Sequence, residues 1–371
     1  MKKILHISKF YHPYYGGIED VVYTIVSELR NDYEQRVICF NHERGTIRTL
    51  DNGIEILRIS TPLSISSQPI SFSYYRHLRR EIKRFKPDYV HLHLPNPLIC
   101  IYLLLCNLYG AKLVVHWHAD ILGKKFLYNF CRPIEQLILK RAEVIISTST
   151  QYVNGSIPLK KYQSKVIVLP NTINENKFYL YDGEEAEVEK IRERYKGKKI
   201  VFFIGRHVEY KGVDYLIRAI NDIDKEAIVL IAGTGQETQH LKRLSESCSD
   251  RVVFLGRLPN EIMKYYFYAS DVFVFPSIDR REAFGVALAE ALYCKLPAVS
   301  FKINDSGTTW VNQNGVTGEV VEKIDEKELA MAINKILRDE DLRKRYSKNA
   351  HEWVCKNFLP NQIQKLKHVY V

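Results

Sequence analysis

Two cations lie five residues apart in a short segment that also contains two glycines. The segment is residues 205–212, GRHVEYKG, and it follows a short apolar run. The planar guanidinium of Arg206 can contact two phosphate oxygens at once, and the Lys211 ammonium is a mobile point charge. Together they could neutralise a diphosphate, both when it binds and when it departs. A solvated loop that carries two cations is the alternative interpretation.

Two carboxylates, Glu282 and Glu290, lie eight residues apart in the stretch EAFGVALAE. We expect a helix over residues 282–292, on which this spacing covers about two turns, or roughly 12 Å, along one face. The helix start would leave the N–H groups of Phe284 and Gly285 free for sugar hydroxyls or phosphate. Glu290, in an otherwise apolar stretch, needs a partner such as a sugar hydroxyl. A capping glutamate and a salt-bridged glutamate are the structural alternative.

Gly16 and Gly17 lie between a predicted strand and a helix that begins near residue 20. A glycine pair at this place lets a ligand approach backbone N–H groups at a helix N-terminus, where a diphosphate or a sugar would fit. A tight turn explains two glycines equally well.

Two histidine pairs, His91 with His93 and His116 with His118, end predicted strands. Such pairs can ligate metal. Since successive strand residues point to opposite faces, we expect only one histidine of each pair to face a ligand. The Asp222-Ile223-Asp224 motif resembles a cation-binding sequence, but it lies between a helix and the next strand, where no ligand is expected.

The elements that position these residues alternate between strands and helices in both halves of the chain. Predicted strands in the first half are residues 3–7, 36–40, 89–93, 113–116 and 144–147, with helices at 74–84 and 133–140. Predicted strands in the second half are residues 200–204, 227–232, 252–255, 272–275 and 298–301, with helices at 215–220, 262–268 and 282–292. This alternation predicts an α/β protein with two doubly wound parallel sheets, whose ligands bind beyond the carboxyl ends of the strands.

The length of 371 residues suffices for two domains. A polar stretch over residues 170–198 separates them, so we expect domains at 1–178 and 179–354. The hydrophobic content of 46% fits two packed cores. The seven scattered cysteines indicate reduced thiols in a cytosolic protein. The first residues form a strand rather than a signal peptide, and the longest apolar run, 98–108, is about half a membrane span.

The positive charge is concentrated in the first half of the chain. Residues 1–178 contain 24 Lys and Arg against 14 Asp and Glu, a net +10, and the remaining residues have a net +1. An anionic partner is therefore expected: nucleic acid, an acidic membrane surface or a phosphorylated substrate. Residues 74–86 form a basic amphipathic helix with aromatic residues, a type that lies on anionic membranes.

The glycine pair, the Arg206 and Lys211 segment and the Glu282 and Glu290 pair together resemble the retaining glycosyltransferases of family 4. These enzymes have the GT-B fold, in which two Rossmann-like domains face a central cleft. The resemblance covers nearly the whole chain, and the motifs occur in the family's order. It implies that the second domain binds a nucleotide-sugar donor and that a C-terminal helix, about 355–371, packs back on the acceptor-side first domain.

The resemblance also implies a role for each residue. Catalytic roles are implied for His118, Arg206, Lys211 and Glu282, with Arg206 and Lys211 neutralising the leaving diphosphate. His118 and Glu282 would contact the transferred sugar. Donor-binding residues are Gly16, Gly17, Arg206, Lys211, Arg257, Leu258, Glu282, Phe284, Gly285, Val286 and Glu290. The base would lie near Arg257 and Leu258, the ribose on Glu290, and no metal or other cofactor is expected.

The substrates are inferred from shorter segments. Residues 11–19 and 116–121 look most like bacterial mannosyltransferases of surface polysaccharide assembly, which use GDP-mannose. We therefore expect a lipid-linked O-antigen or capsule acceptor and a cytoplasmic protein, peripheral on the inner face of the cell membrane. UDP-glucose, UDP-galactose and UDP-N-acetylglucosamine are alternative donors. A GT-B-type nucleotide-sugar epimerase is a rival function, and so is nucleic-acid binding, although no reading motif occurs and no nucleic-acid partner is expected.

Overall fold

The computed structural model describes residues 1–14, 16–65, 68–121 and 125–371. The chain divides into two compact units, Met1–Thr172 with Pro360–Val371 (unit 1) and Ile173–Leu359 (unit 2). The first boundary lies slightly before the expected one after residue 178, because Ile173 and Phe178 are buried in the core of unit 2. The chain returns to unit 1 at Pro360, rather than near residue 355.

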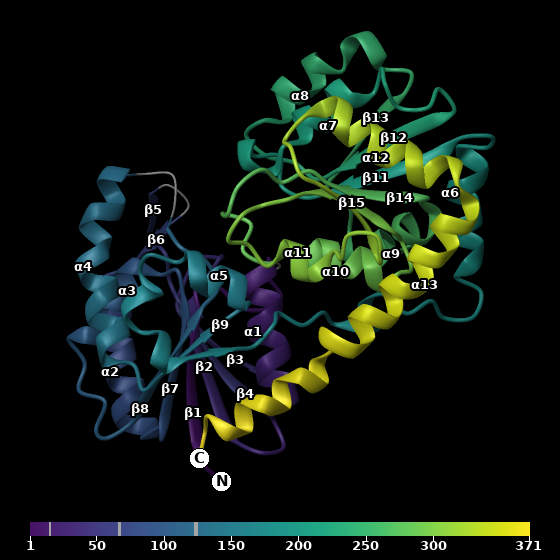
Figure 1. Ribbon diagram of the computed structural model, residues 1–371. Coiled ribbons are helices and arrows are strands. Elements are labelled where there is room, and N and C mark those ends of the chain that lie inside the picture. Colours follow the sequence, from purple (N-terminus) through teal and green to yellow (C-terminus); the bar gives the residue numbers. More distant parts are fainter. Residues whose placement is uncertain (15, 66–67, 122–124) are drawn as a thin grey trace. The chain divides into compact units, whose positions relative to one another are not determined.

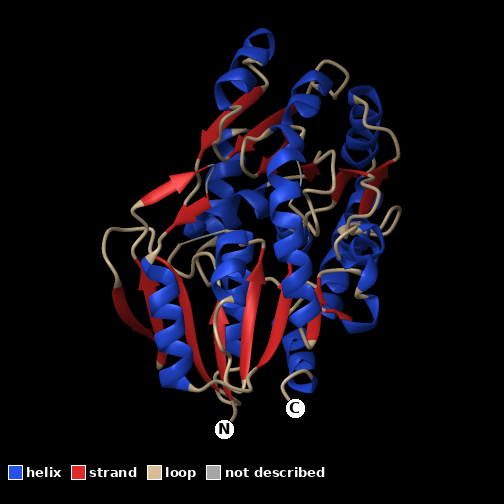
Figure 2. Ribbon diagram, turned by 90° about the vertical axis from the view of Figure 1, so that its left-hand side faces the viewer, coloured by secondary structure: helices blue, strands red, loops and turns tan. Residues whose placement is uncertain are grey.

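Unit 1 contains an eight-stranded sheet in the order β10-β9-β8-β7-β1-β2-β4-β3. Strands are drawn in red in Figure 2. All neighbouring pairs are parallel except β3 with β4. The prediction of an all-parallel sheet is therefore wrong for the edge strand β3. The turn between β3 and β4 is Asn52-Gly53, both with positive φ, the dipeptide that favours a tight hairpin. The strands are β1 (Lys3–Ile7), β2 (Glu34–Phe40), β3 (Ile47–Asp51), β4 (Ile54–Ile59), β7 (Tyr89–Leu94), β8 (Lys112–Trp117), β9 (Val144–Ser147) and β10 (Val166–Val168), and a separate hairpin pairs β5 (Leu63–Ile65) with β6 (Gln68–Ile70).

The C-terminal segment of the chain packs on the first helix of unit 1. Figure 1 shows the 3-10 helix η6 beside α1, and both bury apolar side chains against β1, among them Val21, Ile25, Ile363 and Leu366. The helices of unit 1 are α1 (Gly17–Glu28), α2 (Ser73–Phe85), α3 (Pro97–Leu104), α4 (Lys125–Arg141), α5 (Thr150–Gly155), η1 (Leu159–Lys161), η2 (Gln163–Lys165) and η6 (Pro360–His368). Helix α4 is longer than the predicted 133–140 and contains Pro133.

Unit 2 contains a parallel six-stranded sheet in the order β13-β12-β11-β14-β15-β16. The chain starts at β11 in the middle, builds outwards to β13, then returns to add β14 on the other side of β11. In such sheets ligands bind where the order reverses, beyond the carboxyl ends of the strands. The strands are β11 (Lys199–Ile204), β12 (Ala227–Ala232), β13 (Val252–Gly256), β14 (Val272–Phe275), β15 (Ala298–Phe301) and β16 (Gly318–Val321).

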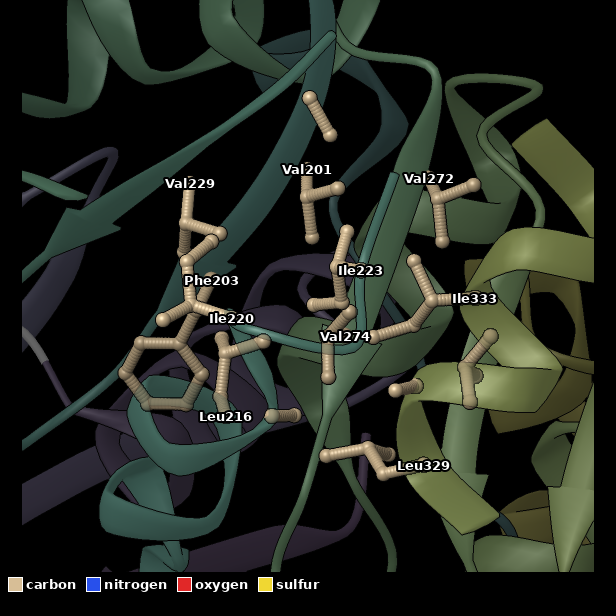
Figure 3. Packing of buried hydrophobic residues seen from close by; sticks show 14 of the residues in the cluster. Val201, Phe203, Leu216, Ile220, Ile223, Val229, Val272, Val274, Leu329 and Ile333 are labelled. Carbon is tan, nitrogen blue, oxygen red and sulfur yellow. The ribbon is translucent and has the colours of Figure 1, made fainter. Parts of the chain in front are cut away.

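Helices cover both faces of the second sheet. Strand residues such as Val201 and Phe203 point to one face and pack with Leu216 of α7 and Ile333 of α12 (Figure 3). Phe202 points to the other face and belongs to the core on that side. The helices of unit 2 are η3 (Glu175–Lys177), α6 (Glu185–Arg194), η4 (Glu209–Lys211), α7 (Val213–Ala219), α8 (Thr238–Leu244), η5 (Glu246–Cys248), α9 (Asn260–Ala269), α10 (Val286–Tyr293), α11 (Thr308–Val311), α12 (Glu326–Arg338) and α13 (Glu340–Asn357).

The helix predicted over residues 282–292 begins later than expected. Helix α10 starts at Val286, and Gly285 before it has a φ of 95°, a left-handed conformation outside the helix. Glu282 lies in a turn, with its backbone N–H donated to the carbonyl of Asp279 over 3.1 Å. Glu282 and Glu290 therefore do not share one helix face, and the expected spacing of two helical turns between them is wrong.

Glycines allow backbones to touch at the carboxyl edge of the second sheet. A Cβ on Gly212 would lie 2.1 Å from the carbonyl oxygen of Pro276, and one on Gly233 would lie 1.8 Å from that of Gly205. A Cβ on Gly235 would lie 2.2 Å from the carbonyl oxygen of His207. The loops after β11, β12 and β14 therefore meet at contacts that no larger residue permits.

Two remaining expectations concern cysteines and membrane spans. All seven cysteines are free thiols, and six of them are buried. Within the described residues, no helix is both long enough and apolar enough to cross a membrane.

The glycine contacts predict a difference between two alanine substitutions. Gly212 and Gly197 have positive φ values of 61° and 77°, but only Gly212 has atoms within 4 Å of an added Cβ. We expect Gly197→Ala to cost about 1 kcal/mol through backbone strain alone, and Gly212→Ala to cost at least about 2 kcal/mol more because its loop must move. Urea unfolding of both variants measures this, and equal losses would contradict the contact.

Candidate functional site

Lys211 and Glu282 form an ion pair at the carboxyl edge of the second sheet. Their charged atoms lie 2.5 Å apart, and the side chains are only 13% and 12% exposed. Lys211 ends η4 after β11, Glu282 follows β14, and these two strands are neighbours. The Lys211 ammonium also lies 4.9 Å from the centre of the Phe275 ring. Because little water reaches the pair, each charge depends on its partner more than in a surface salt bridge.

Hydrogen bonds fix the position of both loops. The backbone N–H of Ile278 donates to the carbonyl of Tyr210 over 2.9 Å, which joins the loop after β14 to the loop after β11. The Ser277 hydroxyl donates to the Glu282 carboxylate over 3.3 Å, and the Ser306 hydroxyl donates to the Glu282 carbonyl over 2.5 Å. The carboxylate is therefore held by its neighbours rather than by a helix.

Arg206 lies on the same edge but is exposed to solvent. Its Nη2 lies 3.3 Å from the Tyr210 hydroxyl. The guanidinium of Arg281 lies 4.8 Å from the centre of the same tyrosine ring. Within this loop, Lys211 is thus a largely buried cation and Arg206 an exposed one. This is the arrangement that an incoming anion requires, because the exposed guanidinium can turn towards it.

The residues before helix α10 offer backbone groups. The side chain of Phe284 is buried, with its ring packed edge-on against Trp310 and Phe358 at centroid distances of 6.3 and 5.3 Å. Gly285 is the N-cap of α10, and Val286 is its first residue. Hence these three residues can bind a ligand only through the main chain at a helix N-terminus, where the dipole favours negative charge. Glu290 lies farther along α10 and is partly buried.

The two residues expected near the base, Arg257 and Leu258, directly follow β13. Arg257 is exposed, and Leu258 packs against the core of unit 2. The loop is tied to its neighbour because the Gly233 N–H donates to the Gly256 carbonyl over 2.7 Å. Apart from Glu290, which lies within α10, the predicted donor-binding residues of unit 2 thus lie in or just after loops that leave the same sheet edge.

The Asp-x-Asp motif lies at the opposite edge. Asp222 and Asp224 precede β12 at its amino end, and Asp224 forms an ion pair with Arg338 over 3.2 Å. Its backbone N–H donates to Asn334 over 2.8 Å. The motif therefore joins a loop to helix α12 at the amino ends of the strands. Lys211 and Glu282 lie at the carboxyl ends.

In unit 1, the predicted site residues lie at the carboxyl ends of strands. Gly16 is the N-cap of α1, Gly17 is the first residue of that helix, and His118 directly follows β8. His118 is buried, and its Nε2 lies 3.2 Å from Nδ1 of His93. The next turn is fixed by Asp120, which accepts hydrogen bonds from the Trp117 indole and the Ser156 hydroxyl, both over 2.8 Å.

The expectation that the two histidines of each pair point to opposite faces of the sheet is wrong. Residues two apart on a strand share a face, and the parallel register places β1, β7 and β8 side by side. Five buried histidines therefore form one cluster, here called the histidine cluster: His6, His91, His93, His116 and His118. Burial lowers the pKa of all five, to about 4 for His6 and about 3 for His118, so the rings are neutral near pH 7.

Several residues around the site were not predicted. Ser277 and Ser306 hold Glu282, and His6 completes the histidine cluster. Ser277 follows strand β14 by two residues, so the rule that ligands bind beyond strand ends could have selected it. No sequence pattern selects Ser306, which is 24 residues from its partner. His6 could have been selected, because it lies near the carboxyl end of the first strand.

Comparison with known proteins gives the same division of the chain. Residues 184–353 match the family described as Glycosyl transferases group 1, and residues 15–177 match Glycosyltransferase Family 4. The chain is 30% identical over 352 residues to the O-antigen chain mannosyltransferase C of Escherichia coli, across 94% of this chain and 92% of that protein. It is 26% identical over 321 residues to the D-rhamnosyltransferase WbpZ of Pseudomonas aeruginosa, across 86% and 82%.

The fold is also similar to solved structures. The crystal structure of Anabaena Alr3699/HepE in complex with UDP and glucose aligns with a TM-score of 0.80 at 19% identity, covering 100% of this chain and 99% of that one. At this identity the likeness bears on the fold, which is GT-B. With two Rossmann-like sheets, two matched family regions and a full-length relative, the chain belongs to the family 4 glycosyltransferases.

Proposed function

We propose that this glycosyltransferase moves mannose from GDP-mannose to a lipid-linked glycan at the inner face of the cell membrane, in the assembly of an O-antigen or capsule. The name of the Escherichia coli relative, an O-antigen chain mannosyltransferase that aligns over nearly its full length, supports both the sugar and the pathway. The Anabaena structure that contains UDP and glucose supports an alternative, a UDP-sugar donor.

One observation carries the transferase chemistry: the Lys211 and Glu282 ion pair beside the exposed Arg206. In a glycosyl transfer the bond between the sugar and the diphosphate breaks, and negative charge grows on the departing phosphate oxygen. Groups that meet this growing charge stabilise the transition state. Lys211 has three N–H donors, so it can hold the Glu282 carboxylate and a phosphate oxygen at the same time.

The proposed reaction retains the anomeric configuration by attack on the same face from which the diphosphate leaves. The departing phosphate oxygen accepts the proton of the acceptor hydroxyl as the new glycosidic bond forms, so no separate general base is required. Arg206 and Lys211 supply the positive charge that a divalent cation would otherwise give, and we propose that donor binding is metal-independent. Glu282 and His118 orient the sugar.

The membrane part of the proposal concerns helix α2. Its apolar residues Tyr74, Leu78, Ile82 and Phe85 are buried in unit 1, so the helix does not offer an apolar face to lipid as an inserting amphipathic helix does. Its outward residues are cations, namely Arg76, Arg79, Arg80, Lys83 and Arg84. Contact with a membrane would therefore be electrostatic, through anionic headgroups.

The first prediction tests the diphosphate site. Arg206→Ala and Lys211→Ala remove charge that acts on the leaving group, so kcat/KM should fall about 10²- to 10³-fold for each. The controls are Arg218→Ala and Lys225→Ala. They remove an exposed arginine and an exposed lysine of unit 2 that lie outside the loops after β11 and β14. Steady-state kinetics with GDP-mannose and an acceptor extract measure the effect; a loss below about threefold for either site variant would refute the assignment.

The second prediction identifies the donor. A ligand that binds only the folded state raises the unfolding temperature, so GDP and GDP-mannose should raise it more than UDP, UDP-glucose and UDP-N-acetylglucosamine at equal concentration. Arg257→Ala, next to the expected base position, should reduce the difference between GDP and UDP. A larger shift with the UDP series would select the alternative donor and leave the transferase assignment standing.

The third prediction tests the membrane surface. Vesicles that contain anionic lipid should bind the protein, and replacing Arg79, Arg80 and Lys83 with Glu should weaken binding at least tenfold, since each cation near the surface contributes about 1 kcal/mol. The control replaces the exposed Lys225, Lys323 and Lys348 of unit 2 with Glu and makes the same change in net charge. Co-sedimentation that is equal for both triple variants, or independent of anionic lipid, would exclude α2 as the membrane contact.

A further inference from the structure

We propose that unit 1 binds a transition-metal ion, Zn²⁺ or an ion with the same preference for imidazole nitrogen, on His6, His91 and His93. This site is separate from the proposed diphosphate site of unit 2 and does not depend on the transferase assignment. Each of the three histidines offers one ring nitrogen, and these atoms all lie within 4.8 Å of one another.

The sheet brings the three ligands together without a loop. In the parallel register His6 is opposite His91, and His93 is the next residue on the same face of β7. Zinc binds imidazole nitrogen at about 2.0–2.1 Å, so three nitrogens on one ion lie roughly 3.3 Å apart in tetrahedral geometry. Binding therefore requires side-chain rotations that shorten the observed spacing of up to 4.8 Å.

The buried nitrogens lack partners among the described residues. Three ring nitrogens are buried without a hydrogen bond: His6 Nδ1, His91 Nε2 and His93 Nε2. Both ring nitrogens of the adjacent His116 are also buried without a hydrogen bond. Each buried polar atom left without a partner carries a free-energy cost, because it has lost its hydrogen bonds to water. A bound ion removes this cost for three ligand nitrogens at once, and His116, with its ring centre 5.3 Å from that of His93, is the nearest candidate for a fourth ligand.

The contacts of His6 fix which of its nitrogens carries the lone pair. Gln35 Nε2 donates to the carbonyl of Val26 over 3.0 Å, so the amide oxygen of Gln35 is the atom that faces His6 Nε2, at 2.9 Å. His6 therefore donates from Nε2, and its Nδ1 has the lone pair that a metal needs. A ligand histidine whose other nitrogen donates to an acceptor is the usual arrangement around metals.

The other two ligands also have outer partners. His91 Nδ1 lies 2.7 Å from the hydroxyl of Tyr370, the penultimate residue of the chain, and His93 Nδ1 lies 3.2 Å from His118 Nε2. Metal bound at His93 Nε2 places the proton on Nδ1, from which it is donated to His118. His118 would then be protonated on its own Nδ1, so the ion would fix the tautomer of a residue to which we assign a role in transfer.

The experiment uses the untagged full-length protein, because an affinity tag of histidines would bind zinc itself. Metal analysis of protein purified without chelator should find close to one transition-metal ion per chain. After removal with chelator, titration with Zn²⁺ alone should saturate at one equivalent and raise the unfolding temperature, and Co²⁺ should give the visible absorption of a nitrogen-ligated site.

Variants locate the ion. His6→Gln and His91→Gln should each lower the bound zinc at least tenfold, whereas His240→Gln, an exposed histidine of unit 2, should leave it unchanged. If a cluster variant fails to fold, the zinc titration of the wild-type protein decides alone. Absence of a stoichiometric ion in that titration, or equal zinc loss in His240→Gln, would overturn the proposal and indicate that water satisfies the buried nitrogens.

Discussion

The close contact between loop backbones at the carboxyl edge of the second sheet is the constraint on which the site depends. The loop after β11 is held from both sides, by Gly212 against Pro276 and by Gly233 against Gly205. Because the carbonyl oxygens lie where a Cβ would be, the loops approach to a distance that side chains normally prevent. This approach brings Lys211 to Glu282 and leaves Arg206 outside. Without it, β11 and β14 would still be neighbours, but their charges would be separated by side chains.

The ion pair has a consequence for ligand binding, because its two charges offset each other. A half-buried ammonium next to a carboxylate is nearly neutral as a pair, so it attracts a distant anion less than a lone cation would. The exposed Arg206 is then the group that meets the anion first, and Lys211 acts at short range through its remaining N–H donors. Holding Glu282 with Ser277 and Ser306 keeps the carboxylate from following Lys211 towards the ligand.

The sequence predicts best where one local pattern decides the structure. Buried strands such as Lys3–Ile7 and Ala227–Ala232 were predicted with their correct ends, because apolar β-formers are bounded by polar residues. The start of α10 was misplaced because the left-handed Gly285 lies inside an otherwise helical pattern. The pairing of β3 with β4 was missed, although Asn52-Gly53 is a strong hairpin signal. The partners of Glu282 depend on tertiary contacts that no spacing in the sequence encodes.

The charge of the first half also depends on structure rather than on the count of residues. Arg36 and Arg48 both donate to the buried carboxylate of Glu81, at 2.5 and 2.6 Å, and these bonds hold the Glu81 pKa below its usual value although burial raises it. Glu81 is the only acid of helix α2, and it points into unit 1. Both arginines also form ion pairs with Glu55, so two carboxylates balance the two cations. The outward face of α2, by contrast, contains cations without any acid between them. Part of the positive charge of residues 1–178 is thus gathered as a local patch on one helix, which is the form of charge that an anionic surface recognises.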